Sequence, residues 1–325
     1  IAVKSEILFE WANMIVIDEA HALKNMNSKR SKEIHRKVFE NSIERLYLLT
    51  GTPIKNRVEE FYSLIALCNY NPRIKESAFL KKFEEHVSFA DQFSHRQEYE
   101  RMVTTKKGYK QKIKVVKWDG IKNEGELKMW LKGIYISKKS KSDPIIYMDV
   151  VVDDADCPEL LAAFNDSKEN SVAPQIKVES AVLKVPYTYD YVKDLIDNNS
   201  GPVIIYTDHI APCEELARLF DVSPITGSMS PEDRSEMAEK FQRGEIPVLV
   251  ATIKSFSTGF NLTASNNIVF NDFSWVPADM SQAEHRINRI GQTKQCYVHR
   301  IIGSVQDNKI LQALDEKMKV IGTVV

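Results

Sequence analysis

Short apolar runs recur along the chain and alternate with segments of helical character. The runs typical of strands buried in a parallel sheet occupy residues 14–17, 46–49, 202–206 and 248–251. Segments predicted as helices occupy residues 28–39, 187–196 and 213–220. The first of these is polar and basic, as expected of a crossover between two parallel strands. This alternation predicts an α/β protein with parallel sheets covered by helices.

Two such α/β regions are separated by a segment of different character. Residues 153–178 are rich in acids and Ser and show little apolar periodicity, which is typical of a linker. We therefore expect a first lobe over 1–152, the linker, and a second lobe over 179–325. Within the first lobe the pattern becomes irregular and charged between about residues 72 and 135, which indicates an insertion.

The insertion contains a basic run that has two interpretations. Residues 104–117 place six lysines around Tyr109. A basic run with an aromatic side chain suits contact with a nucleic-acid backbone. The alternation over 111–117 equally suits a solvated hairpin whose edge is protected by lysines. Both interpretations stay open at this point.

Composition excludes little. The 325 residues carry a formal net charge of −1, so a nucleic-acid partner would need a local basic face. No apolar run has the length of a membrane span, and the four cysteines form no CxxC pair. We expect no membrane association and a reducing, intracellular setting, cytoplasmic in a bacterium or virus and nuclear in a eukaryote.

Two groups of charged residues have the pattern of a phosphate-handling site. Asp18 and Glu19 follow the first apolar run, where the carboxyl ends of parallel strands face a ligand crevice. Asp18 can hold Mg²⁺, and Glu19 can orient or deprotonate water. Arg286 and Arg289 lie three residues apart in a predicted helix ending near Gly291, so that both guanidinium groups would share one face. Such a pair suits a carboxylate or a phosphate.

These residues belong to a series of motifs that resembles one known family. Asp18-Glu-Ala-His21 with Leu23-Lys-Asn25, Thr50-Gly-Thr-Pro-Ile-Lys-Asn56, Tyr206-Thr-Asp-His209, Thr226-Gly-Ser228, Thr252–Ala264 and Gln282–Gln292 follow one another in that order. Together they resemble motifs II to VI of the Swi/Snf branch of the superfamily 2 helicase-like ATPases. Six ordered motifs are far more specific than any single one.

The resemblance implies two RecA-like lobes, the first carrying a helical, basic insertion, and a DNA-stimulated ATPase that translocates on duplex DNA as a monomer. It implies ATP and Mg²⁺ bound between the lobes, with Glu19, Arg286 and Arg289 catalytic and Arg289 the arginine finger. Nucleotide contacts are implied for Asp18, His21, Gly259, Asn261 and Gln292, and Asp18 would bind the metal. DNA contacts are implied for His209, Gly227, Ser228, Thr252 and Lys254.

Three residues depart from the family's usual pattern, and one motif is absent. His285, Asn288 and Val276 stand where the family usually has Asp, His or Ala, and Asn. No G-x-x-x-x-G-K-[ST] occurs in the sequence, and the chain starts at Ile1 without Met. We therefore expect a first lobe that is incomplete at its N-terminus, and negligible ATPase from this chain alone.

Two further functions stay open. The chain could be a non-catalytic fragment that binds DNA or a partner, or it could belong to an RNA helicase of the same superfamily. Within the Swi/Snf branch, the compact second lobe resembles that of small HARP-like annealing helicases, which also act on forked or single-stranded DNA, or that of viral and bacterial members.

Overall fold

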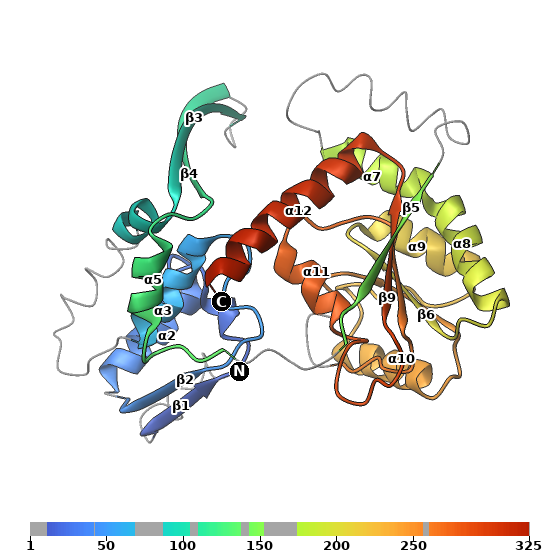
Figure 1. The fold of residues 1–325 in the computed structure, drawn as a ribbon, viewed down its shortest axis with the longest axis horizontal. Coiled ribbons are helices and arrows are strands. Elements are labelled where there is room, and N and C mark those ends of the chain that lie inside the picture. Colours follow the sequence, from blue (N-terminus) through green and yellow to red (C-terminus); the bar gives the residue numbers. More distant parts are fainter. Residues whose placement is uncertain are drawn as a thin grey trace. The chain divides into compact units, whose positions relative to one another are not determined.

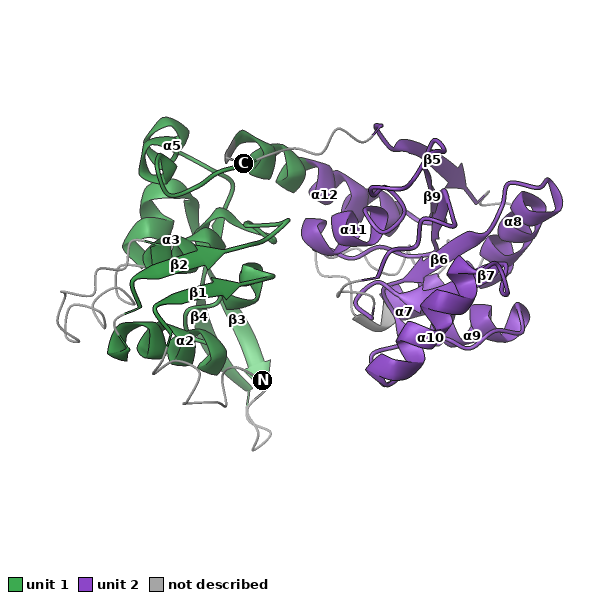
Figure 2. Ribbon diagram, turned by 90° about the horizontal axis from the view of Figure 1, so that it is seen from below, with its two compact units in different colours: residues 1–138, 316–325 green, residues 139–315 purple. Residues whose placement is uncertain are grey.

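The computed structural model describes residues 12–41, 43–68, 87–104, 110–137, 143–152, 174–255 and 260–324. The chain divides into two compact units, residues 1–138 with 316–325 and residues 139–315 (Figure 2). Figure 1 labels most of their helices and strands. No helix among the described residues has the length and apolar character needed to cross a membrane.

The first unit contains the predicted strand–helix–strand arrangement. Strand β1 (Met14–Ile17) pairs in parallel with β2 (Arg45–Leu48), and α2 (Lys29–Glu40) connects them. Ser28 caps α2 by accepting a hydrogen bond from the backbone N–H of Ser31. Buried side chains of α2 pack with those of α3 (Tyr62–Cys68) and of two 3₁₀ turns, η2 (Ala20–Leu23) and η3 (Val58–Phe61). The crossover helix is therefore confirmed.

Complete burial of these two strands is, however, a wrong prediction. Ile15, Ile17, Leu46 and Leu48 are only partly buried against the core of the unit, and Met14, Val16 and Tyr47 are about half exposed. The reason is the period of two along a strand, which turns alternate side chains to opposite faces. Among the described residues the core covers only one of these faces.

The described part of the insertion contains helical residues 87–93, then a hairpin and a further helix, rather than helices alone. Strands β3 (His95–Thr104) and β4 (Lys110–Asp119) pair antiparallel over their full length, and α5 (Glu124–Leu131) follows. The alternation of Ile113 and Val115 with lysines explains the strand, because β-branched residues at period two favour a sheet. Tyr109 and the rest of 105–109 lie outside the described residues.

The second unit is built on a five-stranded sheet of order β5-β9-β8-β6-β7, in which every pair is parallel. Sequence patterns predict β6 and β7 correctly, and the α/β fold is confirmed. The strands are β5 (Ile146–Val151), β6 (Val203–Thr207), β7 (Val248–Thr252), β8 (Asn267–Phe270) and β9 (Tyr297–Ile302).

Helices cover both faces of this sheet, which explains why its central strands are mostly apolar. On one face, Tyr206 and Phe270 pack with residues of α10 (Pro231–Gln242), α11 (Pro277–Glu284) and α12 (Val305–Val324). On the other, Ile205 and Val269 pack with α8 (Val185–Asp197) and α9 (Ile210–Leu219), and α7 (Pro174–Leu183) precedes α8. Truncating a fully buried Phe270 to Ala would destabilise the unit by about 3–5 kcal/mol.

The boundary between the units differs from the predicted one. Residues 146–151 were expected in the first lobe, yet β5 pairs with β9 and the second unit begins at residue 139. The last ten residues, which contain the end of α12, belong to the first unit. Most of the predicted linker, residues 153–173, lies outside the described residues.

Candidate functional site

The first group of predicted site residues lies in a tight turn directly after β1. The Asp18 carboxylate accepts a hydrogen bond from the backbone N–H of Glu19 at 2.8 Å. Glu19 has φ 50° and ψ 45°, the left-handed region that residues other than glycine rarely adopt. That conformation costs about 1 kcal/mol or more, and such strain is typical of functional turns.

His21 joins this turn to the one after β2. Its Nδ1 lies 3.2 Å from the Glu19 carboxylate and 3.1 Å from the Thr50 hydroxyl. The backbone N–H of Ala20 also donates to the carbonyl of Leu49 at 2.9 Å. The motif II and motif III turns are thus held together through side chains and backbone, as adjacent parallel strands allow.

A second contact secures the same turn further along. Lys24 Nζ pairs with the Glu60 carboxylate at 2.7 Å, and the other oxygen of Glu60 accepts the backbone N–H of Asn56 at 2.9 Å. The loop from Thr50 to Asn56 therefore has fixed contacts with residues of motif II at both ends.

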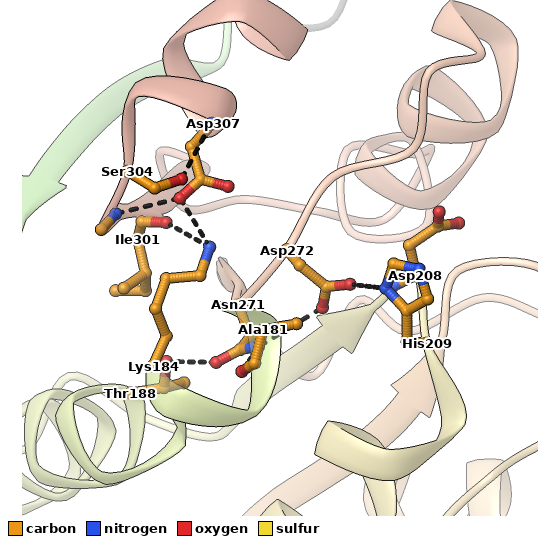
Figure 3. Close-up of polar contacts among 11 residues, drawn as sticks. Ala181, Lys184, Thr188, Asp208, His209, Asn271, Asp272, Ile301, Ser304 and Asp307 are labelled. Carbon is orange, nitrogen blue, oxygen red and sulfur yellow. Dashed lines mark hydrogen bonds and ion pairs between the residues drawn. The ribbon is translucent and has the colours of Figure 1, made fainter. Parts of the chain in front are cut away.

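In the second unit, the turn after β6 carries His209 at the N-cap of α9. The His209 Nδ1 lies 2.7 Å from the carboxylate of Asp272, which follows β8 (Figure 3). The same carboxylate oxygen accepts the backbone N–H of Asp208 at 3.0 Å. Lys254, exposed after β7, lies 3.7 Å from the Asp208 carboxylate. The carboxyl ends of three adjacent strands therefore meet here.

Burial and charge shift the protonation of this group. The hydrogen bond to Asp272 raises the pKa of His209 above its usual value, although desolvation opposes it. Burial raises the pKa of Asp208. Lys177, on α7, lies with its Nζ 4.5 Å from the centre of the Trp275 ring, and burial lowers its pKa while Asp208 and Asp272 oppose the shift.

Sequence reasoning missed the polar network that supports this end of the sheet. Asn271 accepts a hydrogen bond from Thr188 at 2.7 Å and donates to the carbonyl of Ala181 at 2.9 Å (Figure 3). Fully buried Lys184 pairs with Asp307 at 3.0 Å. The available signal was the position of Asn271 and Asp272, because they follow an apolar run as Asp18 and Glu19 do.

The remaining predicted DNA-contact residues lie in two neighbouring turns. Gly227 and Ser228 are exposed, and the Ser228 hydroxyl bonds that of Thr226 at 2.7 Å. Thr252 is buried at the end of β7, and its backbone N–H donates to the carbonyl of Ile225 at 2.9 Å. Exposed backbone and hydroxyl groups in such turns are suited to phosphate oxygens, whereas the buried Thr252 side chain is not.

The predicted helix for the two arginines is wrong. Helix α11 ends at Glu284, and Arg286 and Arg289 lie in the turns that follow. Arg286 is only 2% exposed and donates to the carbonyl of Phe260 at 3.2 Å. Arg289 is exposed and donates to the side chain of Asn261 at 2.7 Å. The two guanidinium groups therefore differ in exposure, although they contact two consecutive residues, Phe260 and Asn261.

Gln292 holds the loop that follows Asn261 in place through hydrogen bonds to backbone carbonyls. Its amide nitrogen donates to the carbonyls of Ser265 at 2.8 Å and of Thr263 at 3.3 Å, and its oxygen accepts the backbone N–H of Lys294 at 3.0 Å. These contacts make it a positioning residue for the segment that holds Arg289. Gly259, predicted to contact the nucleotide, lies outside the described residues.

Comparisons with known proteins agree with these motifs. Residues 3–124 match the SNF2-related domain, and residues 187–292 match the helicase conserved C-terminal domain. Together these matches cover most of both lobes, in the order expected of one family. The chain belongs to the SNF2-related family of helicase-like proteins.

Individual relatives are distant. The Xenopus tropicalis SWI/SNF-related matrix-associated actin-dependent regulator of chromatin subfamily A-like protein 1 is 27% identical, covering 95% of this chain and 33% of that protein. The mouse DNA annealing helicase and endonuclease ZRANB3 is 25% identical over 95% of this chain and 30% of its own length. The Bacillus subtilis putative ATP-dependent helicase/translocase YwqA is 27% identical over 94% of this chain and 35% of its own length.

The chain thus spans about a third of the length of these curated relatives. Among solved structures, the Sulfolobus solfataricus SWI2/SNF2 ATPase core in complex with dsDNA is 21% identical, with a TM-score of 0.41 over 99% of this chain and 71% of that one.

Proposed function

We propose that this chain supplies the later motifs of a DNA-dependent ATPase that translocates on duplex DNA. The observation that carries the proposal is the pair of half-sites, one in each unit. The strained Asp18–Glu19 turn presents two carboxylates, and the Asn261–Arg289 contact presents a cation. The first would supply a metal ligand and a base for water, and the second a charge for the transition state, which are three of the groups that phosphoryl transfer uses.

The residues of the first half-site fit Mg²⁺ and ATP. Asp18 is an exposed carboxylate with one oxygen engaged by the Glu19 backbone, a hard ligand of the kind that Mg²⁺ prefers. In nucleotide sites Mg²⁺ usually takes one or two carboxylates from the protein, and phosphates and water complete its coordination. The metal would neutralise phosphate charge, Asp18 would hold it, and Glu19 would orient the attacking water.

The second unit supplies the proposed DNA contacts. His209 and Lys254 lie after strands of one parallel sheet, at the edge where such sheets bind ligands, and the Gly227–Ser228 turn follows Ile225, which bridges to Ala251 of β7. Cations and exposed backbone N–H groups there suit a phosphodiester chain without reading its sequence. One relative named above is a DNA annealing helicase, and on that basis we extend DNA as a partner to this chain.

The test uses the longest natural polypeptide that contains this chain. Changing Glu19 to Gln keeps the size and the hydrogen bonds but removes the base, and we expect DNA-stimulated ATP hydrolysis to fall by about 10²-fold or more. Duplex binding should be unchanged, because Glu19 is not among the proposed DNA contacts. A wild-type hydrolysis rate in the variant would refute the assignment, and stimulation by RNA but not duplex DNA would favour an RNA helicase.

A second candidate function, a non-catalytic module that binds DNA or a partner, is favoured by two observations. The sequence contains no P-loop motif. In addition, Met14, Val16, Tyr47 and Leu49 are each about half exposed on or next to the two-stranded parallel sheet, whereas parallel sheets are ordinarily covered on both faces. Such an apolar face suits further polypeptide, including one that carries a P-loop.

Addition of a P-loop-bearing segment to the 325-residue chain distinguishes the two candidates. Both predict duplex affinity with negligible ATP hydrolysis for the chain alone, but the ATPase would gain hydrolysis when the segment is added, whereas a non-catalytic module would not. Substituting Val16 and Tyr47 with Ser should abolish that gain. Robust DNA-stimulated hydrolysis by the isolated chain would exclude the non-catalytic function.

A further inference from the structure

The protonation state of the His209 imidazole determines which ligands the ring can bind. Its Nδ1 faces the Asp272 carboxylate at 2.7 Å and therefore carries a hydrogen, so that Nε2 is the atom left to meet a ligand. When the ring is neutral, Nε2 is a lone pair that repels a phosphate oxygen. When the ring is protonated, Nε2 becomes a charged donor, and charge-assisted hydrogen bonds are about twice as strong as neutral ones.

Asp272 is held firmly in place to make this contact. Asp272 is 5% exposed, and one of its carboxylate oxygens accepts hydrogen bonds from the His209 ring and from the Asp208 backbone N–H. Its other oxygen accepts from Asn271 at 3.3 Å. Asn271 is fully buried and is itself fixed by Thr188 and Ala181 (Figure 3). The carboxylate cannot leave without breaking these bonds.

The charges around His209 come from several elements. Asp208 lies beside it in the chain, Asp272 faces it from the end of β8, and Lys177 faces it from α7. Lys254 from the end of β7 pairs with Asp208 rather than with the ring. The two carboxylates favour the protonated imidazole, and Lys177 and desolvation oppose them.

We propose that Asp272 is a positioning residue that keeps His209 protonated, so that the pair acts as a proton-dependent contact to a backbone phosphate of DNA. The inference rests on the proposed function, because it assigns a mechanism to one of its DNA contacts. It adds a residue outside the predicted site, and it predicts that DNA affinity depends on pH near neutrality.

The first experiment is an NMR titration of the histidine ring protons in the full chain without DNA. In the wild type we expect His209 to titrate above 6.5, and in Asp272→Asn we expect its midpoint to fall to 6.5 or below. His299 is an internal reference, because burial lowers its pKa to about 4 and it should stay neutral throughout. An unchanged His209 midpoint would overturn the proposal.

The second experiment measures duplex DNA affinity across the same pH range. Wild-type affinity should weaken about tenfold as pH rises through the pKa of His209, because a hydrogen bond from a charged donor is lost. Asp272→Asn should shift this transition to lower pH, and His209→Gln should remove it. Asp149→Asn is the matched control, since it breaks the exposed pair with Arg300 and leaves His209 untouched.

The outcomes distinguish failure of the proposed function from failure of the His209–Asp272 inference. If the wild type binds no duplex at any pH, the proposed function fails and this inference fails with it. If the wild type binds duplex but Asp272→Asn weakens binding equally at every pH, only the inference fails, because Asp272 would then be merely structural. If inorganic phosphate or ATP, but not DNA, shifts the His209 resonance, the DNA assignment of this contact is overturned.

Discussion

Glu284 is a buried acid that lies two residues before Arg286. Its carboxylate accepts the Tyr147 hydroxyl at 2.9 Å, and burial raises its pKa to about 7, with the Tyr147 hydrogen bond and the charge of Arg300 opposing the shift. The segment after α11 therefore begins at an acid that folding favours in its neutral form.

This burial predicts a pH dependence of stability. Because the folded-state pKa lies above the ordinary value of 4.5, stability falls as pH rises from about 4.5 to about 7. The full effect is roughly 3 kcal/mol. Glu284→Gln keeps an acceptor for Tyr147 and should remove that loss, becoming more stable than the wild type above pH 7. Urea unfolding at several pH values measures the difference, and parallel curves for the two proteins would contradict the prediction.

The buried pair of Lys184 and Asp307 supports a second prediction. Lys184 Nζ also donates to the carbonyl of Ile301, and Asp307 accepts the backbone N–H of Gly303. Lys184→Met leaves a buried carboxylate without its cation and should destabilise the chain by about 3–5 kcal/mol. Adding Asp307→Asn should recover part of that loss in denaturant unfolding.

The control for this pair lies on the surface. Lys240 pairs with Glu236 one turn away on α10, and both side chains are exposed. Lys240→Met should change stability by no more than about 0.5 kcal/mol. An equal loss of unfolding free energy for Lys184→Met and Lys240→Met would show that the buried network of Lys184 does not stabilise the fold more than a surface pair does.

Residue types in these sites could be predicted, but their contacts only in part. Asp18 and Glu19 can be identified from the sequence, because two carboxylates directly follow an apolar strand. The contact between His209 and Asp272 could not be found, because the two residues lie 63 positions apart and meet only through the order of strands in the sheet. Likewise, the spacing of Arg286 and Arg289 indicates a helix, but α11 ends at Glu284 and both residues lie in turns.

At the scale of elements, the β3–β4 hairpin is the clearest separate feature. Its cross-strand pairing places Lys110, Lys112 and Lys114 on one face, opposite Thr104, Met102 and Glu100. Lys112 pairs with Glu100 and Lys114 with Glu98, yet both lysine side chains are about two-thirds exposed. A two-stranded ribbon of this kind can lie along DNA, and the sequence pattern alone allowed either DNA binding or a solvated hairpin.

We expect this face to add to duplex affinity through phosphates. Replacing Lys110, Lys112 and Lys114 by Gln should weaken binding several-fold at moderate salt and reduce the salt slope by about one for each phosphate that is no longer neutralised. Fluorescence anisotropy at increasing salt measures both quantities. Lys128→Gln on α5 is the control, since Lys128 pairs with Glu124 in the same unit. An unchanged slope in the triple variant would identify the hairpin as a solvated face only.

Element types were predictable where periodicity was strong, and boundaries were not. Strands β6 and β7 stand out because both faces are buried, so every position before the final threonine is apolar or aromatic. The place of β5 was not predictable. Its side chains are mostly exposed, and its membership of the second sheet depends on pairing with β9 about 150 residues later.

At the scale of the molecule, the proposed ATPase requires Glu19 and Arg289 to act on the same phosphoryl group. Arg286 is the poorer probe, because it is buried and its loss would disturb folding as well as charge. Arg289 is exposed and is held by Asn261 and by the carbonyl of His285, so Arg289→Ala should leave the fold intact.

We therefore expect Glu19→Gln and Arg289→Ala each to lower DNA-stimulated hydrolysis strongly in the longest natural polypeptide, the arginine change by about 10³-fold. Residues that act as one unit are not additive, so the double variant should be hardly slower than the worse single one. Arg218→Ala, at an exposed pair on α9, is the control. Two losses that multiply fully would mean that the residues serve separate steps, and the joint active site would have to be abandoned.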